Sequence, residues 1–392
     1  MLVLRNRART DRQPGSDRVN IVVDQNIRGA GGTFGRHARL EKLDGRKIRT
    51  HHLADADALI IRTATRVDQA LLRDSGVGFV GTTSIGTDHL EIEWLDQQGI
   101  AWASAPGCNA DSAAQYTLAM IWLACQRLGL RLENTSAGII GRGNVGSRIQ
   151  RLLTVLGVET VANDPPLAER GEPGLVSLEE ALTRDIVCLH VPLESGGTHP
   201  TYRFIAAEQL TRMPDRALLV NTARGDVIDG SALSAELLQG RLHAALDVWP
   251  GEPFLSSELL ESSVVATPHV AGYSDDGKRK GTQMVYRAFC KWAGLTPCRP
   301  PEASGNPLVL DISAGEDAVS IALDAACFVH RHDREMRALS SLGPGQRAIE
   351  FDRLRRDYPP RRDFQAWSIL CQNTEQALIL RKLGFRVRQQ SD

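Results

Sequence analysis

The stretch AGIIGRGNVG, residues Ala137–Gly146, decides the fold of this chain. A short apolar run comes first, and Gly141, Gly143 and Gly146 follow in a G-x-G-x-x-G spacing that opens a helical pattern. Asp164 ends the next apolar run, 18 residues past the third glycine. A strand, a glycine loop, a helix and a later acidic residue together are the fingerprint of a βαβ unit that binds a dinucleotide.

Each position of this loop has its own physical reason. Gly141 permits a tight turn, Gly143 lets the backbone approach a pyrophosphate, and Gly146 lets helix and strand pack closely. The helix begins around Asn144 and Val145, where free amide groups and the positive end of the helix dipole favour phosphate. A glycine-rich turn without a ligand is the alternative, and the flanking strand and helix argue against it.

Asp164 indicates which dinucleotide binds. Its carboxylate would accept hydrogen bonds from the adenosine ribose hydroxyls and would repel a 2′-phosphate, so the sequence predicts NAD as the cofactor. Arg142 leaves the opposite interpretation open, because an arginine near this position can bind the 2′-phosphate of NADP.

Apolar runs at regular spacing extend this unit into a whole domain. Six strand candidates are separated mostly by helical patterns, which predicts a doubly wound parallel sheet in an NAD-binding Rossmann domain over residues 111–270. A predicted helix, Asp111–Leu128, begins this domain and is expected to be buried because its apolar residues nearly encircle it. The six strand candidates are Ala137–Gly141, Val158–Asp164, Asp185–Leu193, Ala217–Thr222, His243–Val248 and Ser263–Pro268.

A second α/β region precedes this domain. Three apolar runs with helical stretches between them predict a flavodoxin-like, substrate-binding domain over residues 19–110. A later helical pattern is expected to complete it, so that residues 271–294 return to this domain. The three runs are Val19–Asp24, Asp55–Thr63 and Gly78–Thr82, and the helical stretches are Val67–Asp74 and Asp276–Gly294.

The chain continues past a proline-rich stretch. Pro297–Pro307 is typical of a linker, which we place at residues 295–307. Residues 308–392 carry two helical patterns, an arginine-rich segment and a strand, which is enough for a small α+β domain. The helical patterns are Gly315–Leu339 and Thr374–Leu383, and the strand is Trp367–Cys371.

Composition limits what else the chain can do. The formal net charge is −1 with 24% charged residues, so no overall field favours nucleic acid or an anionic membrane. Seven cysteines include no C-x-x-C pair, which favours a reduced compartment and offers no start for a metal site.

Residues 1–18 hold five arginines without a secretory apolar run, so we expect a disordered basic tail and a cytoplasmic protein. A basic interaction arm is the alternative for this tail.

Three polar segments follow predicted strands of the second domain: residues 221–225 (NTARG), 247–253 (DVWPGEP) and 268–273 (PHVAGY). Ligands bind at the carboxyl ends of parallel strands. Hydride transfer at a 2-hydroxy acid needs an arginine fork that binds the carboxylate and a base that accepts the hydroxyl proton. A histidine suits the role of the base because the pKa of a histidine lies near neutrality. A neighbouring carboxylate fixes the imidazole tautomer.

Arg224, Glu252 and His269 supply these three parts. Each alone has a structural explanation, since an arginine after a strand is often a surface cation and a histidine after a proline often a packing residue. Their joint position at the ends of one sheet, behind a complete nucleotide fingerprint, favours catalysis.

With these segments the chain resembles the D-isomer-specific 2-hydroxyacid dehydrogenases. The resemblance rests on the glycine loop, N-x-A-R-G, D-V-x-x-x-E-P and the histidine after T-P. It implies that Arg224, Glu252 and His269 are the catalytic residues of an NAD-dependent oxidoreductase.

Further stretches are similar to one branch of that family. This branch oxidises a phosphorylated four-carbon 2-hydroxy acid in pyridoxal 5′-phosphate (vitamin B6) synthesis and forms homodimers through an additional C-terminal domain. The resemblance therefore implies a dimerisation domain at residues 308–392. The stretches include LADADALIIRT (Leu53–Thr63), FVGTTSIGTDHL (Phe79–Leu90), APGCNA (Ala105–Ala110), TPHVAGY (Thr267–Tyr273) and FDRLRRDY (Phe351–Tyr358).

The resemblance also implies positions for both ligands. Val191 stands where a threonine is expected beside the cofactor, so one hydroxyl is lost there. Arg62, after an apolar run, is our candidate for the substrate phosphate, with a surface arginine as the alternative. The implied cofactor positions are Gly141, Gly143, Asn144, Val145, Gly146, Asp164, Val191, Thr222, Ala223, Arg224, Asp247 and Gly272, and the substrate positions are Arg62, Thr63, Ser84 and Tyr273.

Two other functions compete with this interpretation. One is a different D-2-hydroxyacid dehydrogenase, of phosphoglycerate or glyoxylate type, which only the substrate pocket distinguishes. The other is a non-catalytic, NAD-sensing dimer that binds partner proteins. Turnover with a panel of 2-hydroxy acids separates them.

Overall fold

The computed structural model describes residues 18–299, 308–313 and 315–388. These form two compact units, each made of two chain segments. Of the described residues, the first unit combines 18–109 with 275–299, and the second combines 110–274 with 308–313 and 315–388. The predicted basic tail, apart from Arg18, and most of the predicted linker lie outside the described residues.

The first unit is built on a five-stranded, fully parallel sheet in the order β2-β1-β3-β4-β5. This is the flavodoxin-like order predicted for the substrate domain. The central strands are continuous apolar runs buried on both faces, as parallel strands between helices require. The strands are β1 (Val19–Asp24), β2 (Ala38–Leu43), β3 (Ala58–Ile61), β4 (Phe79–Thr82) and β5 (Ala101–Ala103).

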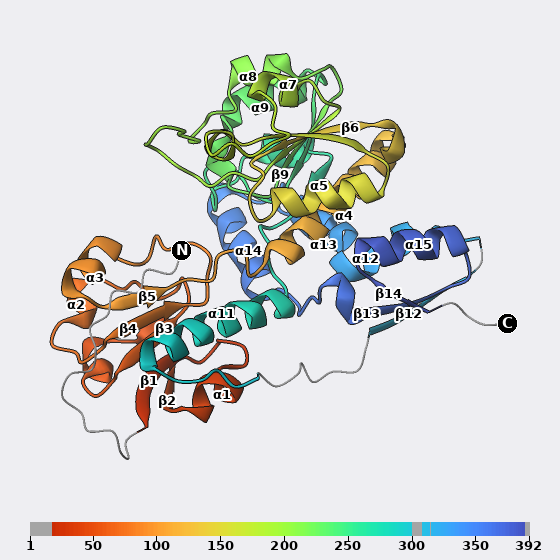
Figure 1. Cartoon of the computed structure of the whole chain (residues 1–392). Helices are drawn as coiled ribbons and strands as arrows, with labels where there is room; N and C mark the ends of the chain where they lie inside the picture. The colour runs from red at the N-terminus through yellow and green to blue at the C-terminus, as the bar shows by residue number, and fades with distance from the viewer. Residues whose placement is uncertain (1–17, 300–307, 314, 389–392) are drawn as a thin grey trace. The chain divides into compact units, whose positions relative to one another are not determined.

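Helices of this unit cover the sheet with two apolar clusters (Figure 1). The long helix α11 packs on β4 and β5, so residues after the second unit do return to the first. The predicted helix over Val67–Asp74 is shorter than expected, because Asp68 caps a single turn. The helices are α1 (Ala30–Thr33), η1 (Phe34–Arg36), η2 (Gly45–Lys47), η3 (Thr50–Leu53), α2 (Gln69–Leu72), α3 (Ile92–Gln98) and α11 (Asp275–Ala293).

The second unit contains a six-stranded parallel sheet in the order β11-β10-β9-β8-β6-β7. All six strand predictions are confirmed to within a few residues: most strands are shorter than predicted, and β6 is displaced by one residue toward the N-terminus. Only β7 lies beyond β6, so the strand order reverses between β6 and β8, and ligands bind at such a reversal. The strands are β6 (Ser136–Ile140), β7 (Glu159–Asn163), β8 (Ile186–Leu189), β9 (Leu218–Asn221), β10 (His243–Leu246) and β11 (Val265–Ala266).

Helix α4 is the buried centre of this unit, as its all-round apolar sequence predicts. It shares one apolar core with the sheet on one side and with the C-terminal helices on the other. The helices of this part are α4 (Ala110–Leu128), η4 (Leu132–Asn134), α5 (Gly146–Val155), α6 (Pro165–Ala168), α7 (Leu178–Leu182), α8 (Ala207–Arg212), η5 (Gly225–Val227), α9 (Gly230–Leu238) and α10 (Ser257–Ser262).

The C-terminal part adds a small sheet in the order β12-β13-β14, and all its strands pair in parallel. It is therefore α/β rather than the α+β arrangement predicted, because helices cross over between consecutive strands. The predicted helix over Gly315–Leu339 is wrong as one element: Phe328 has φ +57° and divides it in two. The elements are β12 (Leu308–Ile312), α12 (Ala318–Cys327), α13 (Val329–Arg337), α14 (Pro344–Arg356), η6 (Phe364–Ala366), β13 (Trp367–Cys371), α15 (Thr374–Leu383) and β14 (Arg386–Arg388).

Two buried charge clusters fasten this C-terminal part to the six-stranded sheet. Asp333 on α13 accepts from Arg127 at 2.6 Å, from Arg337 at 3.0 Å and from the amide of Ala266 in β11 at 2.9 Å. Arg361, which is 2% exposed, donates to the carbonyls of Ala271 and Tyr273. Residues of the C-terminal part thus hold the segment that directly follows His269.

In the described part of the chain, no helix is long and apolar enough to cross a membrane. Among those same residues, no group of three His, Cys, Asp or Glu side chains is placed to hold a metal ion.

Candidate active site

The glycine loop joins β6 to α5 and has the geometry that its sequence predicts. Gly141 has φ +89°, and a Cβ there would lie 2.8 Å from the carbonyl oxygen of His190. At Gly146 a Cβ would lie 1.9 Å from the carbonyl oxygen of Gly141. Gly143 instead borders open space, which leaves room for a ligand against the backbone. The loop therefore fits a pyrophosphate at the N-terminus of α5.

Asp164 lies directly after β7 and ties the loop to the neighbouring strand. Its carboxylate accepts from the amide of Arg142 at 2.8 Å and from the amide of Leu167 at 3.1 Å. A carboxylate has about four lone-pair positions, so acceptor capacity remains for ribose hydroxyls. The guanidinium of Arg142 donates to the carbonyl of Pro173 and lies 3.8 Å from Glu172, so it is already engaged.

Val191 lies beside the glycine loop, since a Cβ on Gly141 would lie 2.9 Å from its Cγ1. The resemblance predicts a threonine at this position, beside the cofactor. The structure places Val191 at the glycine loop, and valine has no hydroxyl. Thr222 follows β9, and its hydroxyl bonds that of Thr117 on α4 at 2.8 Å.

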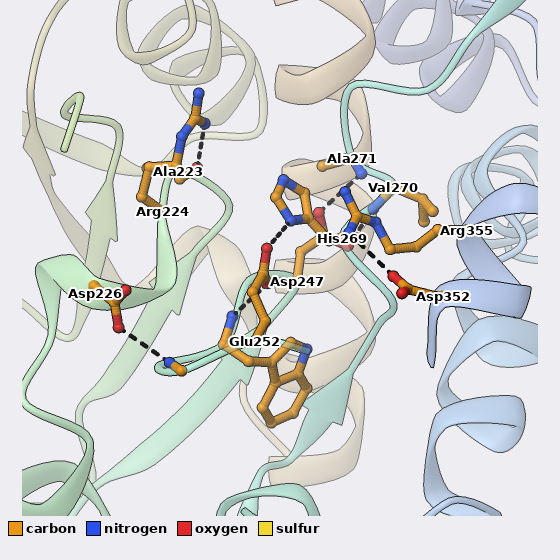
Figure 2. Close-up of polar contacts among 12 residues, drawn as sticks. Ala223, Arg224, Asp226, Asp247, Glu252, His269, Val270, Ala271, Asp352 and Arg355 are labelled. Atoms are coloured by element: carbon orange, nitrogen blue, oxygen red, sulfur yellow. Dashed lines mark hydrogen bonds and ion pairs between the residues drawn. The ribbon is translucent and has the colours of Figure 1, made fainter. Parts of the chain in front are cut away.

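His269 and Glu252 form the centre of the candidate site (Figure 2). His269 Nδ1 lies 2.5 Å from Glu252 Oε1. A carboxylate only accepts, so Nδ1 carries the proton and Nε2 is left as an acceptor. The two side chains are 25% and 24% exposed, so the pair is shielded yet reachable.

A dense backbone network fixes both partners. His269 has φ +56°, an uncommon conformation for a residue with a side chain. Asp247, 1% exposed, holds it there by accepting from the amides of Val270 at 3.0 Å and Ala271 at 2.9 Å. On the other side, Glu252 Oε2 accepts from the amide of Trp249 at 3.2 Å.

The electrostatics keep Glu252 ionised. Burial opposes its charge, but the hydrogen bond and charge of His269, the Trp249 amide and the charge of Arg355 hold its pKa below the usual range. An ionised carboxylate at this position stabilises an imidazolium and fixes the imidazole tautomer.

Arg224 lies after β9 on an exposed loop. Its Nη1 donates to the carbonyl of Ala223 at 2.7 Å, and its own carbonyl accepts from the buried Asn221 at 2.8 Å. Gly225 is required next, because a Cβ there would lie 1.9 Å from the carbonyl oxygen of Trp249. This close approach joins the Arg224 loop to the Glu252 loop, and Figure 2 shows the bond from Glu252 to His269 and the bond from Arg224 to the Ala223 carbonyl.

Other predicted residues lie near this centre or in the first unit. Gly272 and Tyr273 follow Ala271 in a turn closed by the Tyr273 amide and the Val270 carbonyl at 2.8 Å. Thr63 and Ser84 follow β3 and β4, which are adjacent parallel strands, so both residues lie at the carboxyl end of the first sheet. Arg62 forms two hydrogen bonds with Asp24, at 2.9 and 3.3 Å.

Sequence reasoning missed three contributors. Asn221 stands inside the NTARG segment and had no role assigned, although an asparagine at a strand end is a common loop-forming residue. Arg355 and Arg361 come from the arginine-rich C-terminal segment. No local pattern links them to the site, because Arg355 acts on Glu252 and Arg361 donates to the carbonyl of Ala271, both far away in the sequence.

Comparison with known proteins agrees with this geometry. Residues 108–271 match the family model described as D-isomer specific 2-hydroxyacid dehydrogenase, NAD binding domain. An erythronate-4-phosphate dehydrogenase from Marinobacter nauticus is 41% identical over 382 residues, which cover 94% of this chain and 99% of the relative. One from Hahella chejuensis is 38% identical with the same coverage.

Solved structures share the fold. A D-lactate dehydrogenase from Aquifex aeolicus, complexed with NAD and lactic acid, is 23% identical with a TM-score of 0.56 and covers 70% of this chain and 96% of its own. A NAD-bound 3-phosphoglycerate dehydrogenase from Entamoeba histolytica is 21% identical with a TM-score of 0.60, covering 71% and 96%.

The glycine loop and the His269–Glu252 pair thus occur in a chain whose similarity to its relatives runs nearly end to end. The chain has a NAD-binding domain and belongs to the erythronate-4-phosphate dehydrogenases, within the D-isomer specific 2-hydroxyacid dehydrogenase family.

Proposed function

We propose that this chain oxidises 4-phospho-D-erythronate at C2 to (R)-3-hydroxy-2-oxo-4-phosphooxybutanoate, with NAD as the acceptor, in pyridoxal 5′-phosphate synthesis. The observation that carries this proposal is the His269–Glu252 pair at 2.5 Å, on the same unit as the glycine loop. The names of the similar relatives supply the substrate.

His269 is the proposed base. Its Nδ1 is bound by Glu252, so Nε2 takes the proton of the C2 hydroxyl. Glu252 stays ionised and stabilises the resulting imidazolium. When bound, NAD supplies the acceptor for the hydride from C2.

Arg224 is the proposed clamp for the substrate carboxylate. An arginine fork can form two charge-assisted hydrogen bonds to a carboxylate and so orient C2. Its exposed side chain donates from Nη1 to the Ala223 carbonyl, and within the described part of the chain its other donors are left for a ligand.

Thr63, Ser84 and Tyr273 are proposed substrate contacts through their hydroxyls, and Arg62 a counter-charge for the phosphate. The pairing of Arg62 with Asp24 offsets part of its charge, and its side chain is still 38% exposed. The Arg62→Ala variant should raise KM for the phosphorylated substrate far more than for D-erythronate. Equal changes with both substrates would rule out a phosphate role.

Turnover is the direct test of the proposal. We expect NADH formation with 4-phospho-D-erythronate at a higher kcat/KM than with 3-phosphoglycerate, D-lactate or glycolate. A second assay adds a 2-oxo acid that reoxidises retained NADH, and there the 2-oxo product of the tested substrate is measured instead of NADH. Preference for 3-phosphoglycerate would assign a different dehydrogenase activity, and bound NAD without any turnover would favour a sensor.

We also propose that the chain forms a homodimer through its C-terminal part. We further propose that it is located in the cytoplasm. The edge strand β12 presents Val309 at 60% exposure, and Leu378 on α15 is 50% exposed. All seven cysteines are unpaired, which suits a reduced compartment. Light scattering of the full chain should give twice the mass of one chain, and Val309→Lys should lower it.

A further inference from the structure

The C-terminal part brings a positive charge to the catalytic pair. Helix α14 is anchored beside the Glu252 loop by Arg347, which is 6% exposed and donates to the carbonyl of Leu255 at 2.7 Å. Three further bonds from the same guanidinium reach the carbonyls of residues 339, 340 and 342, just before the helix. Two turns along α14, Arg355 is therefore held at a defined place.

Arg355 extends from α14 toward His269 (Figure 2). Its guanidinium lies over the ring of the buried Phe351, 5.6 Å from the ring centroid. Its charge acts on Glu252 and helps to lower the pKa of that carboxyl, after the larger effects of burial and of His269. Arg355 and the catalytic pair belong to one compact unit, so this proximity does not depend on the other.

The donors of Arg355 are largely uncommitted. Among the residues that the structure describes, its ion-pair partner is Asp352, at 3.8 Å, which is beyond hydrogen-bond distance. Asp352 is 60% exposed, so the pair contributes little. Within the described residues, the buried Nε of Arg355 has no hydrogen-bond partner. A buried donor without a partner is costly unless a ligand satisfies it.

The proposed substrate carries two anionic groups, and Arg224 accounts for the carboxylate alone. A phosphate monoester holds nearly two negative charges near neutral pH. Arg62 already shares its charge with Asp24, so a further cation is needed. Arg224 follows β9 whereas Arg355 lies on α14, so the two cations come from different elements and can bind different groups of one substrate.

We propose that Arg355 is a specificity-determining residue whose guanidinium binds the phosphate-bearing end of the substrate. This inference rests on the proposed function. It assigns to the C-terminal part a role in recognising the substrate, in addition to the dimerisation that resemblance implies. Arg355 lies outside the residues that match the family model, 108–271, so the model does not contain this position.

The test compares Arg355→Met with a matched control on the same helix. Arg356→Met removes an equal charge one residue away, at a side chain that is 65% exposed and lies 3.1 Å from Asp357. Both full-length variants are assayed with 4-phospho-D-erythronate and with D-erythronate. Loss of a charge-assisted contact should raise KM for the phosphorylated substrate about 10- to 100-fold in Arg355→Met. KM for D-erythronate should change less than about threefold, and Arg356→Met should change neither.

Other outcomes overturn the inference. An equal fall of kcat with both substrates would mean that Arg355 acts only on Glu252, and unchanged constants would mean that it does nothing. Arg355→Lys keeps the positive charge, so its KM for the phosphorylated substrate should lie between those of the unmodified chain and of Arg355→Met. An arginine with a merely structural role would not give this order. A thermal midpoint near that of the unmodified chain excludes misfolding as the cause.

The proposed function can fail separately. If the unmodified chain does not turn over 4-phospho-D-erythronate, that function is wrong whatever Arg355 does. Calorimetric titration with inorganic phosphate then decides the inference: weaker binding to Arg355→Met than to Arg356→Met supports it, and equal binding overturns it.

Discussion

The loop that carries His269 and the turn that carries Thr63 are built in contrasting ways. His269 is held by Glu252, by the Asp247 network on its backbone and, two to four residues later, by the buried Arg361. Thr63 is exposed on a turn after β3. We infer that the first loop fixes the chemistry, whereas the second adapts to the substrate.

A backbone strained at the point of chemistry explains the difference. The positive φ of His269 costs of order 1–3 kcal/mol in an ordinary chain, so it persists only where its surroundings enforce it. The proposed role of the Thr63 hydroxyl is only to form a hydrogen bond with the substrate, so its backbone needs no such constraint.

The largest effect should come from His269→Asn, which removes the base and keeps a similar polar volume. We expect kcat to fall about 10²- to 10⁴-fold, the usual contribution of a general base. NADH binding, followed by fluorescence, should hardly change. An unaltered kcat would show that the rigid loop does not carry the chemistry.

Glu252→Gln should have the next largest effect, about 100-fold on kcat, because a neutral amide no longer stabilises the imidazolium. Its side-chain oxygen can still accept from the Trp249 amide, so the loop should keep its shape. A thermal midpoint close to that of the unmodified chain checks this. Equal kcat values for the variant and the unmodified chain would contradict the proposed role of Glu252.

Asp333→Asn tests whether the C-terminal part stiffens the strand before His269. The asparagine oxygen can still accept from the Ala266 amide, but the charged acceptor for Arg127 and Arg337 is lost. This loss should lower the free energy of unfolding by about 2 kcal/mol at pH 7, since both arginines are partly exposed. Urea denaturation measures it. The hydrogen bonds of this site hold the pKa of Asp333 below its usual value despite burial.

The sign of the pH dependence follows from that lowered pKa. The carboxylate contributes stability above its unfolded pKa of about 3.9 and loses it as the pH falls through the folded value. The difference between the unmodified chain and Asp333→Asn should therefore shrink toward pH 3. A difference that is the same at pH 7 and pH 3 would show that the charge is not its source.

Much of this account could be predicted from the sequence, because the deciding signals are local. The glycine loop, the buried strands and the three proposed catalytic side chains stand in short motifs whose spacing has a direct structural meaning. Strand β2 was missed because its alternating charged residues, ARLEKL, leave one face exposed and give a weak apolar signal.

The remaining features arise from contacts between distant residues. Phe328 interrupts a continuous helical pattern by a left-handed φ that no glycine marks. Arg355 and Arg361 stand in an arginine-rich helix region whose sequence is typical of a solvated surface. Only the packing of α14 and the following loop turns them toward the catalytic segment.

The smallest effect should come from Thr63→Val, which removes one hydroxyl and keeps the shape. We expect KM for the substrate to rise about three- to tenfold with kcat within twofold, as for an exposed hydrogen bond. A loss of kcat as large as that of His269→Asn would erase the distinction between the two kinds of loop.

The most direct measurement of the central claim follows the hydrogen at C2. With 4-phospho-D-erythronate deuterated at C2 and NAD, mass spectrometry of the reduced cofactor should show one deuterium per turnover in the unmodified chain. Product formed without deuterium in the cofactor would contradict hydride transfer from the carbon beside the carboxylate, and with it the roles given to His269, Glu252 and Arg224.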